Sequence, residues 1–88
     1  MHLAGQRFAR VKVAEMRLYR ADAVSSGRVT RDLYGALREP IDIARDEFRN
    51  RFMAACPSMV DYLHLELIRS LAHEDVELLG PEYPGPII

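Results

Sequence analysis

This sequence lacks several features on which catalytic, metal and membrane sites are commonly built. It contains a single cysteine, Cys56, so an internal disulfide and a multi-cysteine metal site are both excluded. Its five glycines are isolated from one another, which excludes a glycine-rich phosphate-binding loop. No apolar run reaches the roughly 18 residues of a membrane-spanning helix, and early arginines interrupt any secretory signal. We therefore expect a cytoplasmic chain without a transmembrane segment, alone or peripheral to a membrane complex.

The chain of 88 residues has the length of one small domain. At this size, burial of apolar surface barely offsets the conformational entropy that is lost on folding. We expect one helical domain over residues 1–79 and an extended tail over residues 80–88. Contact with a second copy, or with another protein, would supply apolar contacts that so small a core lacks.

Charge is unevenly distributed along the chain. Residues 1–38 carry eight basic and three acidic side chains, a net charge of +5, whereas residues 39–88 carry four basic and ten acidic ones, a net charge of −6. The two halves largely neutralise each other if they fold together. The asymmetry can also direct the basic half towards an acidic protein, towards the acidic half of a second copy, or towards phosphates.

Apolar residues at helical spacing predict a first helix over residues 3–23. Its main apolar face consists of Leu3, Ala4, Phe8, Val11, Ala14, Leu18 and Ala21. A weaker apolar face on the opposite side consists of Ala9, Val13 and Met16. Two such faces indicate a helix with neighbours on both sides, one of which oligomerisation would supply. Gly27 predicts the end of this helix, because glycine readily takes the left-handed conformation.

A second apolar stripe predicts the central helix over residues 31–56, with Thr30 as its N-cap. The stripe consists of Leu33, Leu37, Ile41, Ala44, Phe48, Phe52 and Ala55. Pro40 lies within it, where a proline removes a hydrogen bond and clashes with the preceding turn. Because the stripe keeps its phase through Pro40, we expect one kinked helix. The alternative is a break, with a short helix over residues 31–38 and Pro40 opening the next one.

A third helix is predicted over residues 59–79, after Pro57, with Ser58 and Asp61 in the positions of a capping box. Its inner stripe consists of Val60, Leu63, Leu67 and Leu71. The last nine residues, GPEYPGPII, contain three prolines and predict an extended tail. We expect this tail to dock on its own helices or on another chain through Tyr83, Ile87 and Ile88.

These elements predict an all-α fold. The expected architecture is a three-helix antiparallel bundle with a kinked central helix and an extended proline-rich C-terminal tail. We expect its internal core to contain Val11, Leu18, Phe48, Phe52, Leu67 and Leu71.

A carboxylate and an imidazole three residues apart, Asp61 and His64, are the best candidates for metal chemistry. Di-iron helical bundles use a related Glu-x-x-His pair, completed by glutamates from neighbouring helices. Glu15 and Glu47 would be those glutamates, and a homodimer would double the set. A helix cap and a partly buried, hydrogen-bonded histidine explain Asp61 and His64 more simply. We therefore expect no metal and no other cofactor.

Cys56 is the one thiol that could act as a nucleophile. No histidine lies near it in the sequence, although a histidine close to it in space is left open. A cysteine inside an apolar pattern usually packs as a small hydrophobic residue, so we expect no catalytic residue.

Four arginines of the first helix, Arg7, Arg10, Arg17 and Arg20, recur at spacings that place them on one helical face. Such a stripe suits contact with nucleic-acid phosphates. Arginine is also enriched at protein interfaces, where it pairs with carboxylates and covers apolar surface.

The segments QRFARVKVAEMRLYRADAVSSG and DLYGALREPIDIARDEFRNRF together resemble a helical domain of many uncharacterised bacterial proteins. The shared pattern is Arg-x-Ala-Arg, a leucine-tyrosine step and then a glycine, and it covers about residues 6–52. In that domain a glutamate commonly stands where this chain has Pro40, which favours a continuous helix. The resemblance implies no activity and no catalytic residue.

The sequence as a whole therefore predicts a non-enzymatic protein-protein interaction module. We expect it to self-associate or to serve as an accessory subunit of a larger complex, through the four arginines and the tail. Nucleic-acid binding and a metal-binding homodimer are the alternatives.

Overall fold

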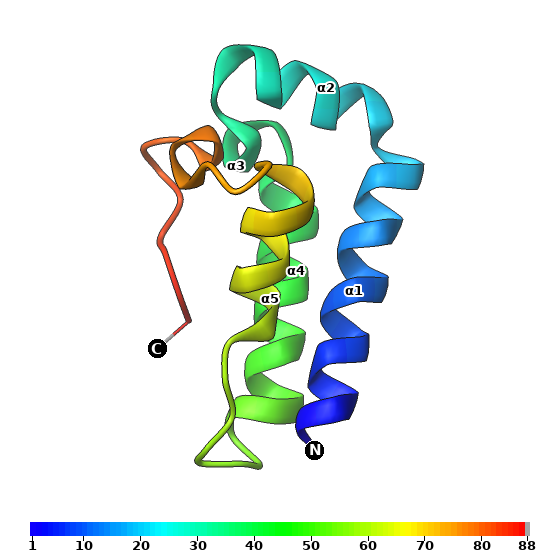
Figure 1. The fold of residues 1–88 in the computed structure, drawn as a ribbon, viewed down its shortest axis with the longest axis vertical. Coiled ribbons are helices and arrows are strands. Elements are labelled where there is room, and N and C mark those ends of the chain that lie inside the picture. Colours follow the sequence, from blue (N-terminus) through cyan, green and yellow to red (C-terminus); the bar gives the residue numbers. More distant parts are fainter. Residues whose placement is uncertain (88) are drawn as a thin grey trace.

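A computed structural model describes residues 1–87 (Figure 1). All regular structure in this part of the chain is helical, which confirms the predicted all-α class. The α-helices are α1 (His2–Tyr19), α2 (Ala21–Thr30), α3 (Leu33–Ala36), α4 (Arg38–Phe48) and α5 (Tyr62–Glu66). The remaining helical turns are the π-helical η1 (Arg49–Met53), which continues α4, the π-helical η2 (Leu67–Leu71), which continues α5, and the 3₁₀ turn η3 (Val76–Leu79).

Helices α1, α4 and α5 run side by side, and α2 and α3 lie across one end (Figure 1). Helix α1 contacts both α4 and α5. Residues 80–87 return along the opposite side of the molecule from α1. None of the helices in residues 1–87 has the length and apolarity that a bilayer-crossing helix requires.

The first predicted helix is interrupted at Arg20, which has φ −126° and ψ 38°. The chain then continues as α2 through Gly27, so the predicted stop at Gly27 is wrong. Gly27 is buried inside α2, and a Cβ atom there would lie 2.9 Å from the Cα of Leu33. Glycine at this position therefore allows α2 to approach α3 closely, rather than ending a helix.

The predicted continuous helix over residues 31–56 is also wrong. Its N-cap is Asp32 rather than Thr30, because the carboxylate accepts a hydrogen bond from the Gly35 N–H at 3.0 Å. The helix breaks at Leu37, and α4 begins at Arg38. Pro40 then lies in the first turn of α4, where a backbone N–H has no partner within the helix, so the ring is tolerated. The structure thus has the break given as the alternative to a kink, but the first helix is α3 (Leu33–Ala36) instead of residues 31–38, and the next begins at Arg38 instead of Pro40.

The third predicted helix begins later and ends earlier than expected. Asp61 is the N-cap of α5, accepting from the His64 N–H at 3.0 Å, as a capping residue does. The helix ends after Leu71, because His73 and Glu74 have positive φ values of 51° and 66° and reverse the chain. This reversal brings Leu79, which is fully buried, back into the core.

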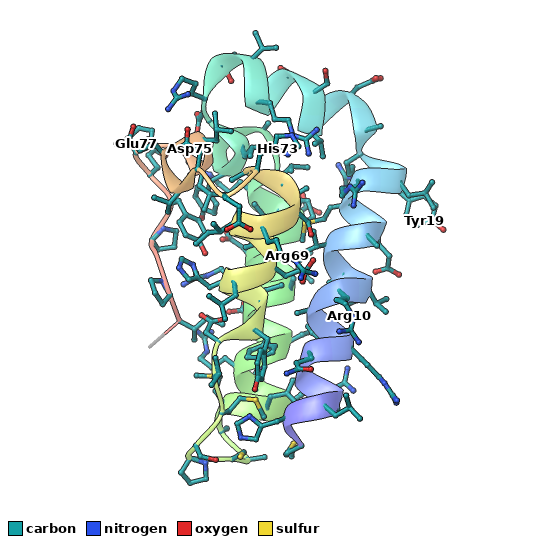
Figure 2. All side chains as sticks on the ribbon, viewed as in Figure 1. Arg10, Tyr19, Arg69, His73, Asp75 and Glu77 are labelled. Carbon is teal, nitrogen blue, oxygen red and sulfur yellow. The ribbon has the colours of Figure 1, made fainter. Side chains whose placement is uncertain are left out.

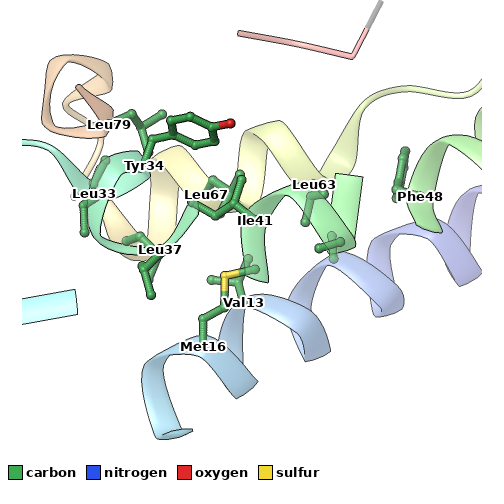
Figure 3. Close-up of a cluster of buried hydrophobic side chains, with 14 of the residues drawn as sticks. Val13, Met16, Leu33, Tyr34, Leu37, Ile41, Phe48, Leu63, Leu67 and Leu79 are labelled. Atoms are coloured by element: carbon green, nitrogen blue, oxygen red, sulfur yellow. The ribbon is translucent and has the colours of Figure 1, made fainter. Parts of the chain in front are cut away.

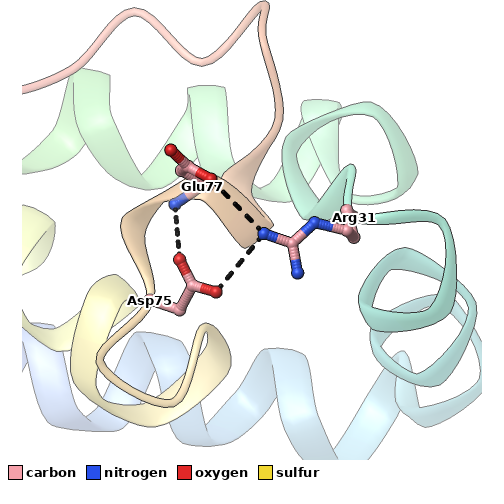
Figure 4. A network of polar contacts seen from close by, with 3 residues as sticks. All are labelled: Arg31, Asp75 and Glu77. Carbon is pink, nitrogen blue, oxygen red and sulfur yellow. Dashed lines mark hydrogen bonds and ion pairs between the residues drawn. The ribbon is translucent and has the colours of Figure 1, made fainter.

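An ion-pair cluster joins the end of α2 to the chain after this reversal (Figure 4). The Arg31 guanidinium lies 3.4 Å from the Asp75 carboxylate and 3.5 Å from that of Glu77. The other carboxylate oxygen of Asp75 accepts from the Glu77 N–H and caps η3. Because all three side chains are exposed, the cluster contributes little stability and mainly orients the turn.

The core is a continuous cluster between α1, α4 and α5, to which α2, α3, η2 and η3 also contribute buried residues (Figure 3). The predicted core residues Phe48, Phe52, Leu67 and Leu71 are buried. Val11 and Leu18 are 55% and 71% exposed, so their assignment to the core is wrong.

The weaker apolar face of α1 is buried, together with Phe8 of the stronger face, which is 8% exposed. Val13 and Met16 are 1% and 4% exposed and point into the core (Figure 3). Gly5 and Ala9, on the same side, are buried as well. Because these two residues are small, α5 and the preceding loop approach α1 closely. The packing gained by this close approach favours burial of this face over the opposite one, although the opposite face has the larger apolar area.

Candidate protein-interaction surface

The outer face of α1 consists of Leu3, Arg7, Val11, Ala14 and Leu18. These residues recur every three or four positions and so form one ridge along the helix. All five are exposed, and Leu3, Val11 and Leu18 are each more than half exposed. The ridge combines aliphatic area with a cationic side chain, the composition that favours contact with another macromolecule.

A shallow groove of about 230 Å³ lies between α1 and α4, next to this ridge. Its lining includes Lys12, Glu15, Tyr19, Pro40, Ile43 and Glu47. The Lys12 Nζ atom lies 3.5 Å from Glu47 and 3.7 Å from Glu15, and so links the two helices. Tyr19 and Ile43 are 75% and 52% exposed, and Tyr19 projects away from the body of the molecule (Figure 2). The α1/α4 groove therefore extends the apolar surface of the ridge.

The structure separates the four predicted arginines. Arg7 belongs to the outer face, whereas Arg10 lines a hollow between α1 and α5. Arg20 lies at the break after α1 and lines the α1/α4 groove. Arg17 is exposed, and none of the four forms an ion pair with another of residues 1–87.

The four metal candidates do not converge on one point. Glu15 and Glu47 lie on either side of Lys12 in the α1/α4 groove. Asp61 is buried at the start of α5, where one carboxylate oxygen accepts from the His64 N–H and the other from the Ile87 N–H. Within residues 1–87 no group of three or more His, Cys, Asp and Glu side chains is arranged to hold one ion.

The tail docks on the chain's own helices. The ring of Tyr83 stacks on that of His64, with centroids 5.7 Å apart, and its hydroxyl lies 2.7 Å from the His64 Nδ1. Burial raises the pKa of Tyr83 to about 12, so the hydroxyl keeps its proton at neutral pH. Ile87 packs against the core, and Ile88 lies outside the described residues.

A chain of polar contacts joins the start of α1 to the loop before α5. The Ser58 hydroxyl lies 3.4 Å from the Cys56 Sγ and 3.2 Å from the His2 Nε2. The His2 Nδ1 lies 2.8 Å from the Tyr62 hydroxyl. Folding thus brings a histidine to the loop that carries Cys56, through Ser58. His2 is 56 residues from Ser58 and 60 residues from Tyr62 in the sequence, so these contacts hold the start of α1 against the loop before α5. We therefore assign them a role in closing this end of the bundle.

Comparison of the chain with models of protein families, with curated proteins and with solved structures finds no match. The resemblance of residues 6–52 to a bacterial helical domain therefore stays a hypothesis. Assignment of function rests on the surface that the fold itself presents.

The sequence predicted that one of the two apolar faces of the first helix meets another copy, but Val11 and Leu18 of the exposed face were assigned to the core. A signal was present in the sequence: Gly5 and Ala9 lie on the weaker face, where they permit close helix packing, and Arg7 interrupts the stronger one. Residues Tyr19 and Ile43 carry no such signal, since only the packing of α1 on α4 brings them together.

Proposed function

We propose that this chain is a non-enzymatic, helical protein-protein interaction module that binds through the outer face of α1. It acts either by self-association or as an accessory subunit of a larger complex. The proposal places it in the cytoplasm, alone or beside a membrane complex.

One observation carries this proposal: α1 packs on the core through its weaker apolar face and Phe8, and leaves the rest of its stronger apolar face in solvent. Leu3, Val11 and Leu18 are 56%, 55% and 71% exposed, although all three are large and apolar. Covering aliphatic side chains of this size stabilises a complex by removing apolar area from water. Five of the ten large apolar side chains that are exposed within residues 1–87 lie on this face or in the adjacent groove.

Nucleic-acid binding is the second candidate, because Arg7, Arg10 and Arg17 are exposed and have no ion-pair partner within residues 1–87. Phosphate contact would satisfy these charges. It would not cover the exposed apolar side chains of Val11 and Leu18 on the same helix. A protein partner satisfies both the charges and the apolar ridge, so we favour it.

The test compares wild-type chain with two matched variants, Val11→Asp and Val29→Asp. Both positions are exposed valines within helices, but Val29 lies in α2, away from the outer face of α1. Tagged proteins are used for capture from an extract of the source cells, and self-association is followed by light scattering. We expect wild-type chain and Val29→Asp to form the same complex and Val11→Asp to lose it while keeping its helical circular dichroism.

Equal complex formation by all three proteins would contradict the proposal. Binding of labelled DNA or RNA that weakens steeply with added salt, and that Arg10→Ala and Arg17→Ala reduce, would favour the second candidate instead.

A further inference from the structure

We propose that the partner of the outer face of α1 is a second copy of this chain, whose α1 runs antiparallel to the first about a two-fold axis at Val11. The inference rests on the proposed function, since it names the partner of the same surface. It follows from a self-complementary arrangement of residues on either side of Val11. A two-fold interface requires such complementarity, because the same surface patch must fit itself.

Side-chain size is complementary about Val11. In an antiparallel pair, positions equally far before and after the axis residue lie at the same height along the interface, and those close to the line through Val11 face each other. Ala4 and Leu18 are each seven residues from Val11, which is two helical turns, so both lie in line with Val11, and both are exposed. The small Ala4 of one copy therefore receives the large Leu18 of the other, and the two Val11 side chains meet at the axis.

Charge is complementary in the same register. Arg7 and Glu15 are each four residues from Val11, so the guanidinium of one copy faces the carboxylate of the other. Arg7 has no ion-pair partner within residues 1–87, and the Glu15 side chain is 49% exposed. A parallel pair would instead place Arg7 against Arg7, which like-charge repulsion disfavours.

The neighbouring surface on the α4 side extends this complementarity. Near the start of α1, a hollow is lined by three basic side chains and no acidic one: Arg7, Lys12 and Arg51. Near the end of α1, the α1/α4 groove is lined by three glutamates and two basic side chains: Glu15, Glu39, Glu47, Lys12 and Arg20. Reversing one copy places the basic hollow against the more acidic groove, twice per dimer.

The groove also supplies apolar contacts for the helix ends. Tyr19 lines the α1/α4 groove, so in the antiparallel pair it faces the same flank at the start of the other copy's α1, where Ala4 and Phe8 line the hollow. Ile43 lines the groove beside Tyr19 and is 52% exposed. One two-fold contact thus covers four large exposed apolar side chains of each copy: Val11, Leu18, Tyr19 and Ile43. Arg10 and Arg17 stay at the rim, on the α5 side.

The experiment measures mass in solution by light scattering and sedimentation at several protein concentrations. Wild-type chain is expected to be a dimer. Val11→Asp and Leu18→Asp are expected to be monomers with wild-type helical circular dichroism, and Val29→Asp is the matched dimeric control. Arg7→Glu alone and Glu15→Arg alone should each weaken dimerisation about tenfold, because each change occurs twice in the interface.

Charge exchange tests the antiparallel register directly. Arg7→Glu combined with Glu15→Arg in one chain restores opposite charges across an antiparallel pair and should return the dissociation constant to near the wild-type value. A double variant as weak as the single ones would overturn the register. A wild-type monomer would overturn the dimer, and a dimer that both Val11→Asp and Leu18→Asp leave intact would overturn the interface on α1.

Failure of this inference is distinguishable from failure of the proposed function. A monomeric wild-type chain that captures a different protein, and loses it in Val11→Asp, overturns the dimer and retains the interaction module. A monomeric wild-type chain whose captured proteins are unchanged by Val11→Asp overturns both.

Discussion

His64 and Tyr83 stack on each other at 5.7 Å and share a 2.7 Å hydrogen bond, which ties the C-terminal tail to α5. Burial lowers the pKa of His64, despite the nearby Asp61 carboxylate, and the Arg45 guanidinium acts in the same direction as burial. The guanidinium of Arg45 also lies over the Tyr83 ring and donates to the Gly85 carbonyl. The neutral imidazole is therefore the form that the folded chain favours.

Stability should fall with acidity because of His64. Its pKa is lower in the folded than in the unfolded chain, so the unfolded chain binds the proton first as the pH falls below about 6.5. The free energy of unfolding should therefore decrease between about pH 7.5 and about pH 5.5. Urea denaturation at each pH measures this, and His64→Gln should reduce the slope.

His73→Asn is the control, since His73 is exposed and Asn tolerates its positive φ. An unchanged slope in His64→Gln would show that another group is responsible.

Removing Phe48 should unfold or severely weaken the chain. Phe48 is fully buried and packs against Phe8 and Phe52, so Phe48→Ala should lower the free energy of unfolding by about 3 to 5 kcal/mol. Leu18→Ala, by contrast, should change it by less than about 0.5 kcal/mol in the monomer, because Leu18 is 71% exposed. Denaturant titration at low protein concentration compares the two, and equal losses would contradict the core described here.

A methyl group added at Gly27 should destabilise the contact between α2 and α3. The new Cβ would lie 2.9 Å from the backbone Cα of Leu33 and 3.0 Å from its Cδ2, so backbone must move. Gly27→Ala should therefore cost about 1 to 3 kcal/mol, although alanine favours helix more than glycine does. Ser25→Ala, an exposed position of the same helix, should be neutral or slightly stabilising in the same thermal unfolding measurement. A stabilised Gly27→Ala variant would rule out this close approach.

Loss of the Asp61 carboxylate should release the tail as well as weaken α5. This buried group accepts from the backbone N–H groups of His64 and Ile87, at 3.0 Å and 2.7 Å. Asp61→Ala leaves both donors without this acceptor and should cost about 2 to 4 kcal/mol. Hydrogen exchange should show a loss of protection at the Ile87 amide.

Asp32→Ala is the matched control for Asp61→Ala, since it also removes a helix cap, the acceptor of the Gly35 N–H. It should cost about 1 kcal/mol and leave the Ile87 amide protected. Loss of protection in both variants would mean that general destabilisation, not the hydrogen bond, frees the tail.

Local patterns in the sequence were sufficient to predict the helical class and much of the core. The periodic apolar residues Phe48, Leu63, Leu67 and Leu71 were predicted to be internal and are fully buried. Ser58 and Asp61 were predicted to cap a helix together as a capping box, and Asp61 does start α5, but it is itself the N-cap in place of Ser58. These predictions hold because helical spacing and capping chemistry act over three or four residues, which a local pattern records.

The positions of the helix breaks and the choice of the internal face of α1 depended instead on contacts between distant segments. The breaks at Arg20 and Leu37 arise where the chain turns to pack its short helices across the bundle, and an apolar stripe keeps its phase through such a turn. The face of α1 that packs inward was chosen by close packing around Gly5 and Ala9. Close packing depends on how the shapes of distant segments fit together, which the hydrophobicity of one segment does not record. The same choice left Val11 and Leu18 in solvent, and with them the surface from which we infer the function.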